Sequence, residues 1–258
     1  LLSAGMASSG EITEALEKHA RKLQGSGLLP MAEFGTRLRE ELIEPLPDLL
    51  ERYRQLLVLW PSRLDSALPI TFQAQGIVLE GWLAGVYQRE DGNCLSVSTI
   101  ANAIGGVRSR KWHRLIRPWV LHLASCAVGL PLTTAVVASD DTLLLDPLPL
   151  DQAQTVLSDL LLAWQTGMTR PLPVAVKTAV AWLSQTDEEK ALAAARKAYE
   201  GDGVTSNGER REAVALMRQF ADFDALVDSE EFEGWAQTLY QPMLEAPWRS
   251  VDEQEARS

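Results

Sequence analysis

Residues 70–87 read ITFQAQGIVLEGWLAGVY and decide the class of fold. Apolar and polar side chains alternate over parts of this stretch, which is rich in β-branched and aromatic residues and is divided by Gly76. Because successive side chains of a strand point to opposite faces, the pattern predicts two β-strands around Gly76. Upstream, from about residue 11 to residue 60, the apolar residues follow a helical period that Pro45 and Pro61 interrupt.

The pattern continues downstream with further strands and helices. Glu90-Asp91-Gly92-Asn93 predicts a hairpin turn, and a return strand begins at Cys94. A helix is expected over about 111–128, followed by short strands at 133–138 and 142–145. Further helices are expected at 151–165, 174–183, 186–199, 209–220 and 232–244, with 250–258 polar and frayed. Helices before, between and after central strands predict an α/β or α+β fold around one mixed sheet.

The period changes suggest three regions. They are an N-terminal helical region at 1–66, an α/β core at 67–186 and a C-terminal helical region with a frayed acidic tail at 187–258. The chain opens Leu1-Leu2 without an initiator methionine, so we expect it to be a piece of a longer protein.

Composition narrows the class of protein. The 258 residues are 46% hydrophobic and 23% charged, which is ordinary for a globular chain. Cys94 and Cys126 match neither a disulfide framework nor a zinc site, so we expect reduced thiols and a cytoplasmic protein. The weakly polar run at 122–139 contains Gly129 and Pro131 and is too broken to span a membrane.

The net charge of −11 is unevenly distributed: −4 over 1–107, +2 over 108–186 and −9 over 187–258. The middle region holds the densest cationic run of the sequence, with Trp112 and Trp119 interleaved. Its members are Arg108, Arg110, Lys111, His113, Arg114 and Arg117. Such a run is able to bind phosphates; the alternative is a solvated helix start or a face paired with the acidic last third.

Other chemistry is sparse. No Walker A loop occurs, so we expect no ATP site here. His122 falls on the apolar face of its predicted helix and is expected to be a core histidine. Trp82 and Trp119 are expected in the core, and the two cysteines are expected to be buried.

Several segments taken together resemble one family. They are GLLP at 27–30, LEGWL at 79–83, WVLHLASCAVG at 119–129, DPLP at 146–149, GMTRPLP at 167–173 and LYQPM at 239–243. Their order and spacing are similar to the C-terminal domain of RecC, the gamma subunit of exodeoxyribonuclease V. The resemblance runs from about residue 25 to residue 247.

The resemblance implies an α/β fold of the PD-(D/E)XK nuclease type, with a central mixed sheet flanked by helices and the active site lost. Such nucleases hold Mg²⁺ with carboxylates on adjacent strands. At the expected ligand position of the first strand this chain has Ala84, and the next strand reads CLSVST at 94–99, without an acid or a lysine. We therefore expect no catalytic residue, metal or cofactor in this domain, with ATP and Mg²⁺ used by the partner subunits.

The expected role is a scaffold domain that helps to hold and split duplex DNA ends and docks the RecB and RecD subunits during double-strand break repair. Beside the basic run, the hairpin at 86–94 is a candidate projection into DNA, in which Tyr87 stacks on a base and Arg89 reaches a phosphate. The alternative for the hairpin is an ordinary connection. The alternative function is a stand-alone DNA-binding module or a cryptic metal-dependent nuclease.

Overall fold

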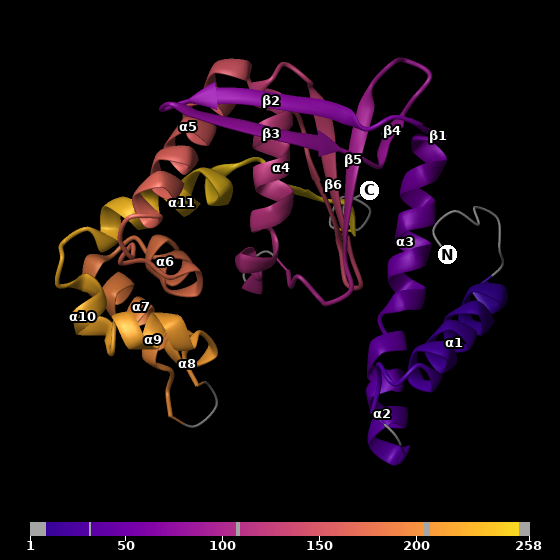
Figure 1. Cartoon of the computed structure of the whole chain (residues 1–258), viewed down its shortest axis with the longest axis horizontal. Coiled ribbons are helices and arrows are strands. Elements are labelled where there is room, and N and C mark those ends of the chain that lie inside the picture. Colours follow the sequence, from indigo (N-terminus) through magenta and orange to yellow (C-terminus); the bar gives the residue numbers. More distant parts are fainter. Residues whose placement is uncertain (1–8, 31, 107–108, 204–206, 253–258) are drawn as a thin grey trace.

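A computed structural model of the chain describes residues 9–30, 32–106, 109–203 and 207–252. At its centre is a six-stranded sheet in the order β1-β4-β5-β6-β7-β8, with helices on both faces (Figure 1). The pair β5–β6 is parallel and the other pairs are antiparallel, so the sheet is mixed. The predicted α/β class with a central mixed sheet is confirmed.

The elements follow the predicted order. The first helices are α1 (Ser9–Gly25), α2 (Ala32–Ile43) and α3 (Leu46–Leu59). The strands are β1 (Ser62–Arg63), β2 (Leu68–Ala74), β3 (Ile77–Leu83), β4 (Val86–Gln88), β5 (Cys94–Ile100), β6 (Leu132–Ala138), β7 (Thr142–Leu145) and β8 (Arg249–Ser250). The later helices are η2 (Trp112–Arg114), α4 (Ile116–Ala127), α5 (Leu150–Gly167), α6 (Val176–Leu183), α7 (Glu188–Glu200), α8 (Glu209–Glu212), α9 (Val214–Gln219), α10 (Phe223–Val227) and α11 (Phe232–Glu245).

Alternation along β6 divides the apolar residues between the two faces of the sheet. Val136 and Ala138 pack into a core with α4, α5 and the inner face of β2–β3. Ala135 and Val137 pack into a second core with α3. A strand that is covered on both faces has to be apolar throughout, and all of β6 from Thr134 to Ala138 is buried.

The stretch 70–87 forms two paired strands around Gly76, as expected, but they are not part of the main sheet. β2 and β3 pair only with each other in a ribbon that crosses the α4 and α5 side of the molecule (Figure 1). Ile70, Phe72 and Leu83 face the core, whereas Trp82 is 74% exposed. The expectation that Trp82 is a core residue is wrong, because it lies on the outer face of the ribbon.

A buried pair of phenols joins α3 to the sheet. The hydroxyl groups of Tyr53 and Tyr87 are 2.5 Å apart, and the rings meet edge to face. Tyr87 is only 8% exposed. Burial and the bond to Tyr87 raise the pKa of Tyr53, so the Tyr53 hydroxyl stays neutral in the physiological range.

The helices after α5 form a third core around Tyr199, Phe223 and Phe232. The predicted helix at 209–220 is divided into α8 and α9, and α10 was not expected. Glu209, in α8, is buried and accepts hydrogen bonds from the backbone N–H groups of Lys177 and Thr178. It therefore caps the first turn of α6 from a distant part of the chain.

The end of the chain is more ordered than expected. Arg249 and Ser250 form β8 at the edge of the sheet, and the Asp252 carboxylate is 2.5 Å from the Arg52 guanidinium of α3. The expectation that the polar tail frays from residue 250 is wrong for residues 250–252; residues 253–258 lie outside the described part. The predicted region boundaries at 66/67 and 186/187 remain predictions.

We predict that Tyr53→Phe and Tyr87→Phe each lower the free energy of unfolding by about 1–2 kcal/mol, because each leaves the other buried hydroxyl without its partner. The double substitution is expected to cost less than the sum of the two, since it removes both hydroxyls. Urea unfolding of the four proteins measures this coupling. Strictly additive losses would contradict the pairing.

Candidate nucleic-acid interface

The loop before the basic run is held by a turn between two strands of the sheet. Asp140, in the turn between β6 and β7, accepts hydrogen bonds from the backbone N–H groups of Ile104 and Gly105, each at 2.8 Å. Gly105 has a φ of +75°, and a Cβ there would lie 2.5 Å from the Ser109 carbonyl oxygen. The turn therefore fixes the path of the chain into the basic run.

Arg110 points into the molecule. Its side chain is 5% exposed, and its guanidinium lies 3.7 Å from the carboxylate of Asp141, which is 9% exposed. Asp141 also accepts a hydrogen bond from the Ser250 hydroxyl at 2.8 Å. Burial raises the pKa of Asp141, and Ser250 and Arg110 oppose that rise. In this structure the Arg110 guanidinium is enclosed and paired with Asp141, so it is not offered to DNA, and the predicted contact with DNA stays a prediction.

The other members of the run have different surroundings. Arg114 is half-buried and donates a hydrogen bond to the Ala103 carbonyl. His113 is half-buried, and burial lowers its pKa, which favours the neutral ring near pH 7. Lys111 and Arg117 are exposed, with no ion pair or side-chain hydrogen bond to any described residue. Arg108 lies outside the described residues.

The hairpin at 86–94 forms as predicted, with Val86 opposite Ser96. The side chain of Tyr87 is buried against Tyr53, so Tyr87 does not offer its ring to a DNA base in this structure. Arg89 is exposed, and its guanidinium lies 5.0 Å from the centre of the Trp60 ring.

The expected ligand position is occupied by alanine, and its place in the fold differs from the prediction. Ala84 is exposed and lies in the link between β3 and β4 rather than within a strand. Ala84 lies two residues before Val86, and Val86 pairs with Ser96 in β5. β5 pairs with β4 and not with β3. The residues at the expected ligand positions are therefore Ala84, in the link before β4, and Ser96, in β5.

The acids of this region serve structural contacts. Asp146, after β7, pairs with Arg249 at 2.6 Å, while Asp140 and Asp141 hold the loop and β8. Glu80 is exposed on the outer face of the β2–β3 ribbon. Within the described ranges, no group of three or more His, Cys, Asp or Glu side chains is placed to hold a metal ion.

His122 is a core histidine, as expected. It is 1% exposed, its Nδ1 lies 2.9 Å from the Thr134 hydroxyl, and its ring stacks on Trp119. Burial lowers the pKa of His122 to about 4. Trp119 and Cys126 are buried as expected, whereas Cys94 is half-buried.

The model of the RecC C-terminal domain family matches residues 1–187, which is more than half of the chain. The chain belongs to the RecC C-terminal domain family. Membership in the RecC family implies a role in the RecBCD complex, exodeoxyribonuclease V. A search of curated proteins found no match.

The RecC family match ends within the link between α6 and α7, so the third hydrophobic core lies largely beyond it. The Asp140–Asp141 turn, α4 and the basic run lie inside it. None of the helices in the described ranges is long and apolar enough to cross a bilayer.

Two features of this region were missed from the sequence. The link from Arg110 to Asp141 and Ser250 joins residues up to 140 positions apart, for which local patterns carry no signal. The sequence did contain one indication of this link, the two acids Asp140 and Asp141 in the predicted hairpin turn. Carboxylates in a turn are able to accept hydrogen bonds from neighbouring loops. A second feature that was missed is a cleft between α6, α7 and α11, which lies outside the basic run.

We predict that Arg110→Ala lowers the free energy of unfolding by about 3 kcal/mol, because it leaves the enclosed Asp141 carboxylate without its cation. The matched control Arg117→Ala removes an exposed arginine of the same run and should change stability by less than about 0.5 kcal/mol. Urea unfolding at pH 7 measures both. Equal effects of the two substitutions would contradict the inward position of Arg110.

Proposed function

We propose that this domain is a non-catalytic scaffold of exodeoxyribonuclease V, which helps to hold and split duplex DNA ends and docks the RecB and RecD subunits. The observation that carries the proposal is the chemistry at the β4–β5 pair. In the proposed relationship to PD-(D/E)XK nucleases, the ligand positions correspond to Ala84, in the link before β4, and to β5, whose side chains include Ser96 and Ser98 and no acid or lysine. Such side chains do not replace the hard anionic ligands that Mg²⁺ requires.

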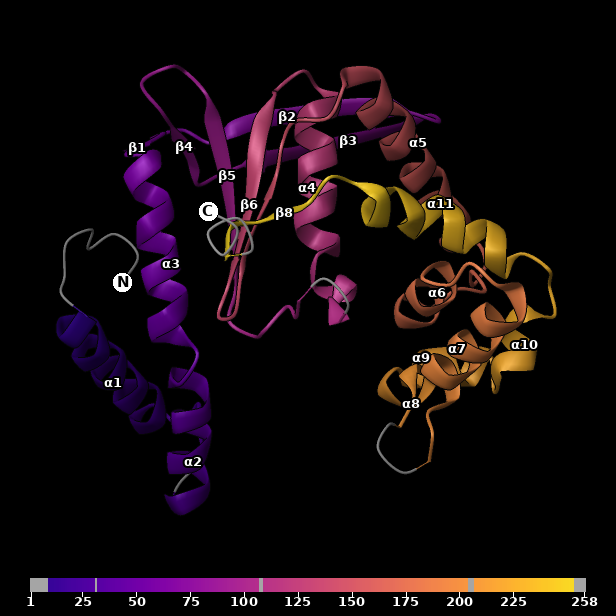
Figure 2. The ribbon, with the colours of Figure 1, turned by 180° about the vertical axis from the view of Figure 1, so that it is seen from behind.

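The proposed fold relationship is to PD-(D/E)XK nucleases. A mixed sheet in which an antiparallel pair, β4–β5, is followed by a helical crossover, α4, to the parallel strand β6 supports it. Helices cover both faces of that sheet (Figure 2). In this proposal the domain holds no cofactor of its own, and ATP and Mg²⁺ act in the partner subunits, in the cytoplasm.

The DNA-facing surface is proposed at Lys111 and Arg117. Both are exposed cations near the start of α4, and they lie in the one region of the chain with a net positive charge, +2 against −9 in the last third. A phosphate contact releases condensed counterions, so a small basic patch gives a measurable, salt-dependent contribution to binding even on an acidic protein. Motors in the partner subunits would supply the energy for unpairing, about 1.4 kcal/mol per base-pair step.

We predict that Lys111→Ala with Arg117→Ala weakens DNA-end binding by the assembled complex. The negative slope of log K against log salt should become shallower by about 2, roughly one for each phosphate that the variant no longer neutralises. Fluorescence anisotropy with a labelled duplex end over a salt series measures both quantities.

The matched control is Arg21→Ala with Arg37→Ala. These exposed arginines of α1 and α2 pair with Glu17 and Glu41 one helical turn away, and the substitutions remove the same net charge. We expect the control to leave the slope unchanged. An unchanged affinity and slope in the α4 variant would overturn the DNA-facing assignment.

A second experiment tests the loss of catalysis. Incubation of the chain with linear duplex DNA and Mg²⁺ or Mn²⁺ is expected to leave the DNA intact, and gel analysis of end-labelled DNA reports it. Asp146, an exposed carboxylate after β7, is the acid to replace as a control. Degradation that disappears with Asp146→Ala would establish a cryptic nuclease in place of the scaffold.

A further inference from the structure

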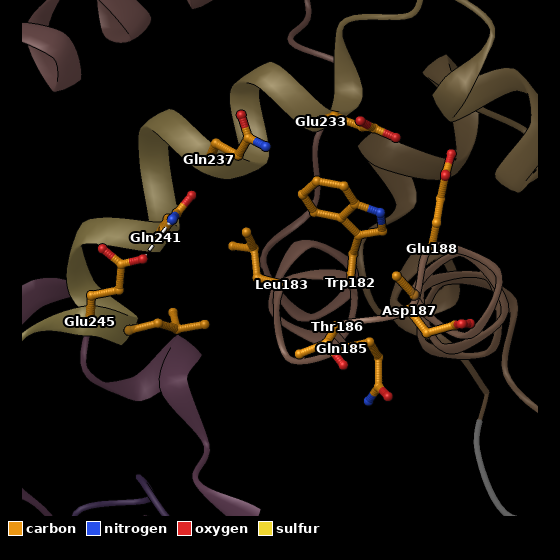
Figure 3. A pocket seen from close by; sticks show the side chains of 12 residues that line it. Trp182, Leu183, Gln185, Thr186, Asp187, Glu188, Glu233, Gln237, Gln241 and Glu245 are labelled. Atoms are coloured by element: carbon orange, nitrogen blue, oxygen red, sulfur yellow. Dashed lines mark hydrogen bonds between the residues drawn. The ribbon is translucent and has the colours of Figure 1, made fainter.

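A cleft of about 620 Å³ lies between the end of α6, the start of α7 and one face of α11 (Figure 3). Its apolar lining comes from Trp182, Leu183, Ala191 and Leu244. The indole of Trp182 is central in Figure 3 and packs edge to face on Phe232 at 6.0 Å. Phe232 is buried, so this contact holds the indole against the third hydrophobic core.

The rim of the cleft is acidic and amide-bearing. α11 presents Glu233, Gln237, Gln241 and Glu245 at intervals of four residues, so these side chains line one face of the helix (Figure 3). The start of α7 adds Asp187 and Glu188 opposite them. No lysine or arginine is among the lining residues.

Two of these carboxylates are already used within the protein, and two are not. Asp187 caps α7 by accepting a bond from the backbone N–H of Lys190, and Glu245 accepts one from the Gln241 amide. Glu188 and Glu233 are exposed and make no ion pair or side-chain hydrogen bond with the described residues. In Figure 3, Glu233 lies above Trp182 and Glu188 lies to its right.

This combination selects the chemistry of an occupant. A carboxylate rim repels a nucleic-acid backbone and attracts cations. An indole in the same cleft as two carboxylates that are unpaired in the described part of the chain suits a guanidinium, which stacks on aromatic rings and forms charge-assisted hydrogen bonds with carboxylates. Leu183 and Leu244 favour apolar side chains next to that cation. The volume fits a few side chains of a peptide segment, not a folded domain.

We propose that the cleft between α6, α7 and α11 binds an arginine-bearing amphipathic segment of a protein partner. The proposal rests on the proposed function in one respect: a scaffold within a multi-subunit machine requires surfaces that receive its partner subunits. It assigns such a surface to the helical side of the molecule that carries α6–α11.

Photo-crosslinking in the reconstituted complex tests the identity of the occupant. Position 237 is exposed on the rim, so the substitution Gln237→p-benzoylphenylalanine places the reactive group over the cleft. We expect a crosslink to an arginine-bearing segment of a partner subunit, mapped by mass spectrometry. A crosslink to DNA, to a segment without a basic residue, or to no partner would overturn the proposal.

The matched control is the same photo-reactive residue at Asp159, an exposed position on α5 away from the cleft lining. It should not crosslink to the segment that position 237 reaches. Capture of the same segment from both positions would overturn the proposal, because it would show contact without selection by the cleft.

Charge reversal tests the recognition. Glu188→Lys with Glu233→Lys should weaken association of the partner by about tenfold or more, because repulsion replaces two charge-assisted contacts. The milder pair Glu188→Gln with Glu233→Gln retains size and should give a smaller loss in the same direction, so the result does not depend on one variant folding. The control pair Glu33→Lys with Glu40→Lys changes the net charge equally at exposed positions of α2.

Equal losses in the cleft pair and the α2 pair, or no loss in the cleft pairs, would overturn the proposal. DNA-end binding is measured on the same samples, and we expect the cleft pairs to leave the affinity of the assembled complex unchanged. Loss of DNA binding through Lys111 and Arg117 with intact assembly reports on the proposed DNA-facing surface, so the two proposals fail separately.

Discussion

The Asp140–Asp141 turn joins segments that are far apart in the chain, and the surroundings of the basic run depend on it. Asp140 accepts hydrogen bonds from the backbone N–H groups of Ile104 and Gly105. Asp141 forms an ion pair with Arg110 and accepts a hydrogen bond from the Ser250 hydroxyl. Asp140 is exposed, whereas Asp141 is buried, and a buried carboxylate is stable only when charges and hydrogen bonds compensate for the water that is removed. The turn, the loop before α4 and the last strand therefore stabilise one another.

This arrangement divides the basic run by role. Arg110 compensates a buried carboxylate, and Arg114 holds the loop through the Ala103 carbonyl. Lys111 and Arg117 remain at the surface. The acids of this region form ion pairs and hydrogen bonds within the protein, as the ion pair between Asp146 and Arg249 shows.

Local patterns predicted much of the fold. The hairpin at 86–94, the β6–β7 turn, the core position of His122 and most helices depend on periodicity and on turn residues, which act over a few positions. Strand alternation predicted β2 and β3 but not their partners, since pairing is decided by tertiary packing. Trp82 shows the consequence: alternation does not reveal which face of a ribbon is buried.

The site was less predictable than the fold. Five fixed cations within ten residues mark a charged segment, but they do not show which side chains turn inward, because that depends on Asp141 and Ser250 far along the chain. Tyr87 was predicted to stack on DNA, and its burial depends on Tyr53 in a helix that precedes the sheet. The acidic α6–α7–α11 cleft gathers residues from three helices and carries no compact sequence signal.

The most direct test of the structural role of the turn is hydrogen–deuterium exchange of the chain and of Asp141→Asn, each with and without millimolar Mg²⁺. We expect the substitution to speed exchange at 109–110 and at 249–250 together, because Asp141 pairs with Arg110 and accepts a hydrogen bond from Ser250. We expect Mg²⁺ to change neither segment in the unsubstituted chain. Protection of these segments by Mg²⁺, or unchanged exchange in Asp141→Asn, would contradict a turn whose carboxylates serve structure rather than a metal.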